Sequence, residues 1–84
     1  MDKQDIITRV NDILIDKLCI NNRDELKPEA KLAEDLSADS LDAIDITMEI
    51  EHQFNISISD YQMHQMTDGG TVQDIYTMVE EALK

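Results

Sequence analysis

Apolar residues recur at helical spacing along most of the chain, whereas the alternation typical of strands is nearly absent. Because apolar side chains three or four residues apart share one face of a helix, each such stripe predicts an amphipathic helix. The first helix is expected from about Lys3 to Leu18, with Asp2 as its N-cap. Its buried stripe is predicted to be Ile6, Val10, Ile13 and Leu14, with the aliphatic stem of Lys17 at its end.

Three further helices are predicted after a long connection. The second is expected from about Ser40 to Phe54, and a short third helix from about Asp60 to Met66. Ser59 and Gln62 have the spacing of a capping box at the start of this third helix. The last helix is expected after Thr71, with a predicted stripe of Val72, Ile75, Tyr76, Val79 and Leu83.

The connection over residues 19–39 is long for a loop without structure of its own. Asn21, Asn22 and Pro28 argue against a continuous helix, and a short helical turn is expected near Pro28–Ala30. Four apolar side chains are expected to pin this loop onto the core, namely Ile20, Leu26, Leu32 and Leu36. The pattern therefore predicts an all-α fold: a single domain over residues 1–84, forming a small four-helix bundle with a short third helix and a long loop between helices one and two.

Composition narrows the function through charge. The 84 residues include 19 Asp and Glu against 7 Lys and Arg, which gives a formal net charge of −12. Residues 32–83 contain many Asp and Glu residues but no Lys or Arg. Such a surface repels nucleic acids and anionic lipids, so we expect no nucleic-acid partner and no stable membrane insertion. It attracts basic protein partners instead.

The chain has one cysteine, Cys19, and its first residues lack the layout of a signal peptide. Cys19 is expected to pack at the end of the first helix, and the aromatic residues are expected in the core. These features favour a cytoplasmic protein, and we expect a monomer.

The second predicted helix is unusual because it carries two apolar stripes separated by acids. With about 100° of rotation per residue, its core stripe comprises Ala43, Ile46, Thr47, Ile50 and Phe54. The adjoining acidic face comprises Asp42, Asp45 and Glu49. Beyond the acids lie Leu41, Ile44 and Met48. Either the long loop or the third helix covers this second stripe, or the stripe is an exposed patch rimmed by carboxylates, to which a partner docks.

Ser40 stands at the start of this helix, where serine is typically a cap. No histidine pairs with it at a readable spacing, so a hydrolase nucleophile has little support. A calcium loop starting at Asp35 would need Gly and Glu where Ser40 and Ile46 stand. His52 and His64 lack the pattern of a zinc site, so no metal site is expected.

The residues around Ser40 carry a family resemblance. Glu34-Asp35-Leu36 followed by Asp39-Ser40-Leu41-Asp42, in mid-chain of an acidic helical domain, closely resembles the acyl carrier proteins, and the resemblance covers nearly the whole chain. It implies a carrier with no catalytic residues of its own. Ser40 would hold a covalent 4′-phosphopantetheine arm, transferred from coenzyme A by a phosphopantetheinyl transferase. The arm would carry acyl groups as thioesters between acyl-transferring enzymes, most simply those of fatty acid biosynthesis.

The resemblance also implies roles for the two faces of the second helix. The partner-docking residues would be Asp39, Leu41, Asp42, Ile44, Asp45, Met48 and Glu49, which would meet basic enzyme surfaces. The lining of an acyl cavity would be Ile46, Ile50, Phe54, Ile58, Met66 and Ile75.

Three features depart from the family pattern. Ser37 replaces a common glycine, Thr47 replaces an aliphatic residue, and Asp68-Gly69-Gly70 resembles a small insertion. They leave the pathway open. The alternatives are a specialised carrier for polyketide, lipid or aminoacyl-type assembly and, in a different class, an unmodified acidic helical protein-interaction module.

Overall fold

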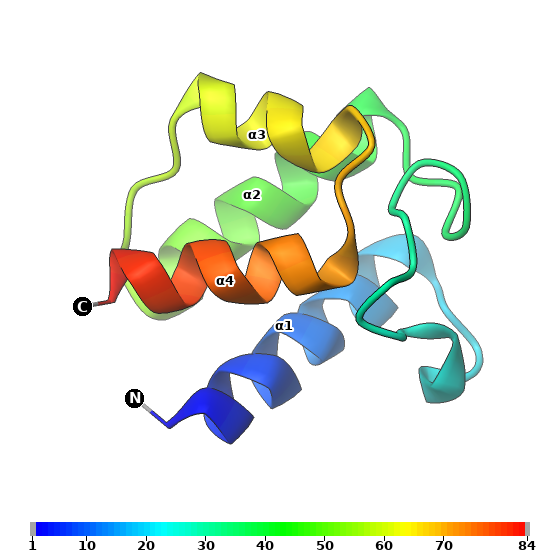
Figure 1. The fold of residues 1–84 in the computed structure, drawn as a ribbon, viewed down its shortest axis with the longest axis horizontal. Coiled ribbons are helices and arrows are strands. Elements are labelled where there is room, and N and C mark those ends of the chain that lie inside the picture. Colours follow the sequence, from blue (N-terminus) through cyan, green and yellow to red (C-terminus); the bar gives the residue numbers. More distant parts are fainter. Residues whose placement is uncertain (1, 84) are drawn as a thin grey trace.

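The computed structural model describes residues 2–83, apart from the side chain of Thr67. Four α-helices follow one another along this part of the chain (Figure 1). They are α1 (Lys3–Leu18), α2 (Ser40–Phe54), α3 (Asp60–Thr67) and α4 (Val72–Ala82), with a short 3-10 helix, η1 (Arg23–Glu25), between α1 and α2. The expected all-α fold with four helices and a short third one is confirmed. None of the helices in residues 2–83 is long and apolar enough to cross a membrane.

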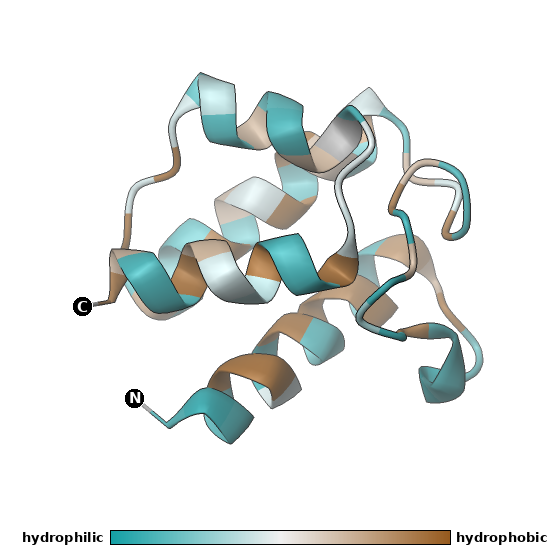
Figure 2. Cartoon of the chain, viewed as in Figure 1, coloured by the Kyte–Doolittle hydropathy of each residue, from teal (hydrophilic) through white to brown (hydrophobic). Residues whose placement is uncertain are grey.

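The core lies between α1, α2 and α4, each of which buries four or five side chains. Hydrophobic and hydrophilic residues alternate along each of these helices (Figure 2), and the buried residues of the three helices form one hydrophobic cluster. α3 contributes Met66 to this core. The hydroxyl of Tyr76 in α4 also donates a hydrogen bond to the side-chain oxygen of Asn11 in α1, which ties the two helices together.

Two capping boxes hold the starts of the later helices. Ser59 and Gln62 form the predicted box at α3, and Thr71 forms an equivalent one with Asp74 at α4. Each box pairs two amide N–H groups that the helix itself leaves without partners. Asp2 stands at the N-cap position of α1 as predicted, but its side chain accepts no hydrogen bond from the helix. Only its main-chain carbonyl does, from Ile6 at 3.1 Å.

The long loop is pinned as expected, with Leu26 and Leu32 buried and Ile20 and Leu36 packed against the core. The helical turn lies earlier than predicted, at η1, because the side chain of Asn22 accepts the amide of Asp24 and starts the turn there. Residues 28–29 form only a simple turn.

The end of this loop is fastened to the start of α4 by main-chain hydrogen bonds. Leu32 donates to the carbonyl of Gly70 at 3.0 Å, and Val72 donates to that of Ala30 at 3.0 Å. Between them, Lys31 and Thr71 form an antiparallel bridge. The segment that leads to α2 is therefore held by α4.

Two expected core residues lie at the surface. Cys19 is exposed because it ends α1 in the left-handed conformation (φ 54°), where its amide bonds the carbonyl of Ile15 and its side chain turns outward. Tyr61 is 71% exposed, since it stands in the first turn of α3, whose buried residue is Met66 near the other end. Phe54 and Tyr76 are buried as predicted.

Candidate functional site

Ser40 is the first residue of α2 and is exposed to solvent. Within the described part of the chain its hydroxyl makes no hydrogen bond. The first amide groups of a helix also lack partners inside it and carry the positive end of the helix dipole. A hydroxyl at this place is accessible to a large partner, and a phosphate bonded to it would meet a favourable field.

The interpretation of Ser40 as the helix cap is wrong. The cap is Asp39, whose Oδ1 accepts the amide of Asp42 at 2.9 Å. Asp42 reciprocates with Oδ2, which accepts the amide of Asp39 at 3.1 Å. This capping box fixes both carboxylates on either side of Ser40 and leaves the serine hydroxyl without a structural task.

The second apolar stripe of α2 lies at the surface. Leu41 is 72% exposed, Met48 62% and Ile44 41%. Neither the long loop nor α3 covers these side chains, so the structure favours the exposed patch over the buried alternative. Scattered exposed apolar residues are ordinary, but three on one face of one helix form a patch of the kind that partners cover.

The remaining acids predicted for docking follow the same helix. Asp45 is exposed and stands near the apolar patch in the helix register. Glu49 is half-buried and lies 3.8 Å from the Lys17 ammonium of α1, while Gln53 donates a hydrogen bond to it at 3.0 Å. Asp39, Asp42 and Asp45 make no ion pair within residues 2–83, so these three carboxylates are open to a basic partner.

The residues predicted to line an acyl cavity belong to the hydrophobic core. Ile46, Ile50 and Ile75 are fully enclosed, and Phe54 and Met66 are buried as well. Ile58 is only half-buried, since it lies in the segment that leads into α3. The structure gathers these side chains in one hydrophobic core, with Ile58 packed against its edge.

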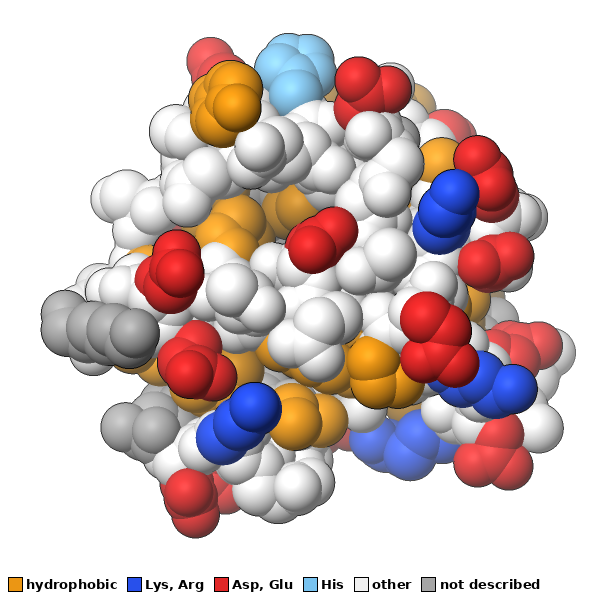
Figure 3. Space-filling view, viewed as in Figure 1, with side chains coloured by type: hydrophobic (Ala, Val, Ile, Leu, Met, Phe, Trp, Pro, Cys, Tyr) orange, Lys and Arg blue, Asp and Glu red, His pale blue; other side chains and the backbone are white. Residues whose placement is uncertain are grey.

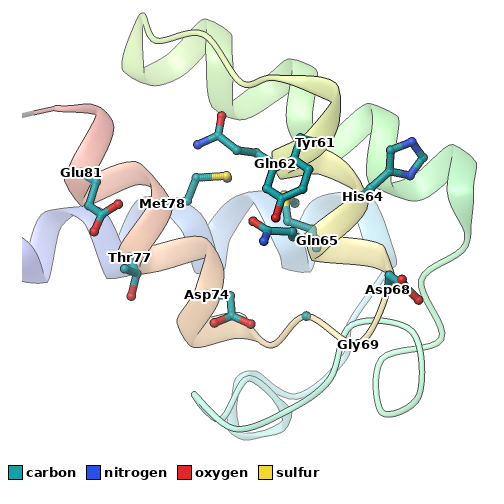
Figure 4. A pocket seen from close by; sticks show the side chains of 12 residues that line it. Tyr61, Gln62, His64, Gln65, Asp68, Gly69, Asp74, Thr77, Met78 and Glu81 are labelled. Atoms are coloured by element: carbon teal, nitrogen blue, oxygen red, sulfur yellow. The ribbon is translucent and has the colours of Figure 1, made fainter.

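A separate hollow of about 620 Å³ lies between α3 and α4. Tyr61, Gln65 and Met78 line it together with the acids Asp74 and Glu81 (Figure 4). In the space-filling view its floor is hydrophobic and acidic side chains stand around it, while Lys and Arg lie over α1 and the long loop (Figure 3). Sequence patterns do not reveal this hollow, and no residue of α2 lines it.

Other chemistry is sparse in the part of the chain that the structure describes. No group of three or more His, Cys, Asp or Glu side chains is arranged there to hold a metal ion. His52 and His64 are exposed. One buried polar side chain stands out: the Thr47 hydroxyl, which is enclosed in the protein and has no hydrogen-bond partner. The sequence signal for this residue was that Thr47 stands where the acyl carrier proteins usually have an aliphatic residue.

The comparisons with known proteins agree with this geometry. Residues 8–79 match the family described as "Phosphopantetheine attachment site". Proteins named "Acyl carrier protein" from Chlorobium phaeovibrioides and Chlorobium luteolum are each 40% identical to this chain over 73 residues, which cover 87% of it and 88% of theirs. Another of that name from Chlorobium phaeobacteroides is 42% identical over 60 residues, covering 71% of this chain and 76% of that one. The chain therefore belongs to the acyl carrier proteins, a family of carriers rather than catalysts that bear a phosphopantetheine group.

Proposed function

We propose that this protein carries acyl groups on a 4′-phosphopantetheine arm bonded to Ser40 and delivers them to the enzymes of fatty acid biosynthesis. The observation that carries the proposal is the accessible, unpartnered hydroxyl of Ser40 at the first position of α2. The arm supplies a terminal thiol, which holds the acyl group as a thioester. Everything else is supplied by the chain: a fixed attachment point, a docking surface and an apolar interior.

The structure around Ser40 fits a phosphodiester. The helix N-terminus favours negative charge, and the serine side chain has no bond to break before modification. The nearby carboxylates of Asp39 and Asp42 oppose that charge, but each has an oxygen engaged by a backbone amide. They are well placed to meet the basic side chains, or a metal ion, that a phosphopantetheinyl transferase would bring.

We assign docking to a surface made of Asp39, Leu41, Asp42, Ile44, Asp45, Met48 and Glu49, called here the α2 surface. Its apolar members give contact area, and Met48 adapts to partners of different shape because its side chain is flexible. Its carboxylates give attraction over distance, although each exposed ion pair is weak alone. Such a surface binds quickly and releases quickly, and its binding weakens with salt. A carrier that visits many enzymes needs these properties.

The relatives, which are chains of comparable length named acyl carrier protein, support acyl groups as the cargo. Thr47 within the core and the Asp68-Gly69-Gly70 segment keep a specialised carrier as the second candidate, since they alter the interior and the approach to α4. The native cargo decides between them. Saturated acyl groups of graded length on the protein isolated from its own cells would support the first, and a single unusual acyl or aminoacyl group would support the second.

Attachment is tested by intact-mass measurement after incubation with coenzyme A and a broadly active phosphopantetheinyl transferase. The wild type and Ser57→Ala, which changes another exposed serine, are expected to gain the mass of one phosphopantetheinyl group. Ser40→Ala is expected to gain none. A gain in Ser40→Ala would move the attachment elsewhere, and no gain in any variant would leave an unmodified interaction module as the function.

A further inference from the structure

The hydroxyl of Thr47 is a polar group in a core that is otherwise built of hydrophobic residues. Among the described residues, Thr47 is the one buried polar side chain, with 5% of its surface exposed. Its Oγ1 has no hydrogen-bond partner. A threonine inside a helix commonly bonds the carbonyl four residues earlier, here that of Ala43, but this bond is not formed. A buried polar group without a partner destabilises the fold, so its presence needs an explanation.

Two contacts, one on either side of α2, show which way Thr47 faces. Glu49 lies near Lys17 of α1, so its side of α2 faces α1. Glu51 accepts the amide of Ile58 at 3.0 Å, so its side faces the segment that leads into α3. Thr47 stands four residues before Glu51, on the same side, and two residues before Glu49, on the other. Thr47 is therefore on the side of the core that borders α3.

On this side the core is covered by α3, the α-helix with the fewest buried side chains. α3 buries only Met66 among its described side chains, whereas α1, α2 and α4 bury four or five each. Elements with few buried apolar contacts open at the lowest free energy. The hollow between α3 and α4 also leaves space beside α3 into which its side chains can move (Figure 4). Opening between α2 and α3 would uncover Thr47.

Thr47 is also within reach of the attachment point. Seven residues separate it from Ser40, so it stands almost on the same side of α2 and about 10 Å along the axis, by the rise of an α-helix. A group delivered on an arm from Ser40 into the core would pass this side chain.

We propose that Thr47 Oγ1 donates a hydrogen bond to an oxygen atom on the cargo when the core opens between α2 and α3. The acceptor is either an oxygen on the acyl chain itself, as in a β-hydroxyacyl group, or the thioester carbonyl that every acyl group shares. In the first case Thr47 selects oxygenated acyl chains over plain hydrocarbon chains. The inference rests on the proposed function, because it needs a cargo attached at Ser40.

The experiment compares the unmodified protein with two loaded forms, octanoyl and β-hydroxyoctanoyl, in the wild type, Thr47→Val and Thr47→Ser. Valine keeps the shape and removes the hydroxyl, while serine keeps the hydroxyl. Thr8→Val, on the exposed side of α1, is the matched control. Intact mass confirms loading first, Tm is then measured for each form, and the NMR shift of the residue 47 amide gives a second readout.

Unmodified Thr47→Val is expected to melt at least about 4–8 °C above the wild type, the Tm shift that about 1 kcal/mol, the lower cost of an unpaired buried group, produces in a domain of this size. If the acyl oxygen is the acceptor, the wild type gains more Tm from β-hydroxyoctanoyl than from octanoyl. That difference disappears in Thr47→Val and persists in Thr47→Ser and Thr8→Val. If the thioester carbonyl is the acceptor, both loaded forms lose the same stabilisation in Thr47→Val.

Equal gains in the wild type and Thr47→Val for both cargoes, with no cargo-dependent shift at residue 47, would overturn the role of Thr47 and leave the carrier function intact. Failure of the wild type to load would overturn the carrier function and the inference together. The mass measurement separates these two outcomes before any melting curve is recorded.

Discussion

Asp39 and Asp42 hold each other's backbone at the start of α2. A carboxylate oxygen of each accepts the amide hydrogen of the other, at 2.9 and 3.1 Å. The same two side chains flank Ser40 and belong to the α2 surface. Their structural and docking roles can be separated, because an asparagine caps a helix about as well as an aspartate but carries no charge.

Asp39→Asn is expected to keep the free energy of unfolding within about 0.5 kcal/mol of the wild type. It should raise the KM of the phosphopantetheinyl transferase for this protein and weaken the dependence of that KM on salt, because one attractive charge is gone. Urea unfolding and transfer kinetics at low and high ionic strength measure the two effects. Asp5→Asn makes the same change of charge on an exposed residue of α1. An equal rise in KM for Asp5→Asn would show that net charge, and not the α2 surface, governs docking.

Met48→Ala is expected to reduce transferase kcat/KM about tenfold if Met48 is a central contact of the α2 surface. The free energy of unfolding should stay within about 0.5 kcal/mol of the wild type, because the side chain is 62% exposed. Ile46→Ala is the matched change two residues earlier, where the side chain is 1% exposed. It should cost about 2–5 kcal/mol of stability through the cavity it leaves. Unchanged kinetics in Met48→Ala would remove Met48 from the docking surface.

Gly70→Ala is expected to destabilise the fold by about 1–3 kcal/mol, the usual cost of forcing atoms into a packed site. A Cβ at Gly70 would stand 2.7 Å from the Cα of Met66 and would also strike the carbonyl of Gln65. These are backbone atoms, so the clash cannot be relieved by a side-chain rotation. Gly69→Ala meets open space but must adopt a φ of 88°, which costs about 1 kcal/mol. Urea unfolding should therefore rank Gly70→Ala below Gly69→Ala, and the reverse order would contradict the packing at Gly70.

Alkaline pH should destabilise the protein through Tyr76. Burial raises the pKa of Tyr76 above its ordinary value of 10.0. The folded state thus holds this proton more tightly than the unfolded state, and the stability it contributes is complete below pH 10 and lost as pH rises through the folded pKa. The free energy of unfolding should fall above pH 10 in the wild type. Tyr76→Phe should lack that part of the slope and lose about 1 kcal/mol at neutral pH with its hydrogen bond. Tyr61→Phe, at an exposed ring, should keep the wild-type slope.

The helices could be predicted because their apolar residues repeat with the period of the helix itself. Where a different interaction decides the structure, prediction failed at particular residues. Ser40 looked like a cap, but Asp39 and Asp42 satisfy each other's amides and leave Ser40 unused. Cys19 looked like a core residue, but the left-handed turn that ends α1 directs it outward. The helical turn expected at Pro28–Ala30 is only a simple turn, and the short helix of this loop is η1, where Asn22 captures the amide of Asp24.

The residues of the candidate site could be predicted from the sequence, but their exposure and hydrogen bonding could not. The spacing of Leu41, Ile44 and Met48 placed them on one face, and only the packing of α3 and the loop could decide that this face is uncovered. The unpartnered hydroxyl of Thr47 is likewise a property of the assembled core. A sequence shows that a hydroxyl is present, whereas the orientation of neighbouring carbonyls decides whether it finds a partner.

The main-chain bonds between the long loop and the start of α4 have a mechanical consequence. Leu32 and Gly70, and likewise Ala30 and Val72, tie the chain that leads to Ser40 to the helix that stays packed in the core. α3 itself takes no part in these bonds, but Gly70 follows it in the chain and lies against its last turn, at Gln65 and Met66. The main chain before Ser40 is thus bonded to the start of α4 rather than to α3. If α3 moved to admit an acyl chain, these bonds would hold the segment before Ser40 in place, and a partner enzyme would meet the same α2 surface on the empty and the loaded carrier.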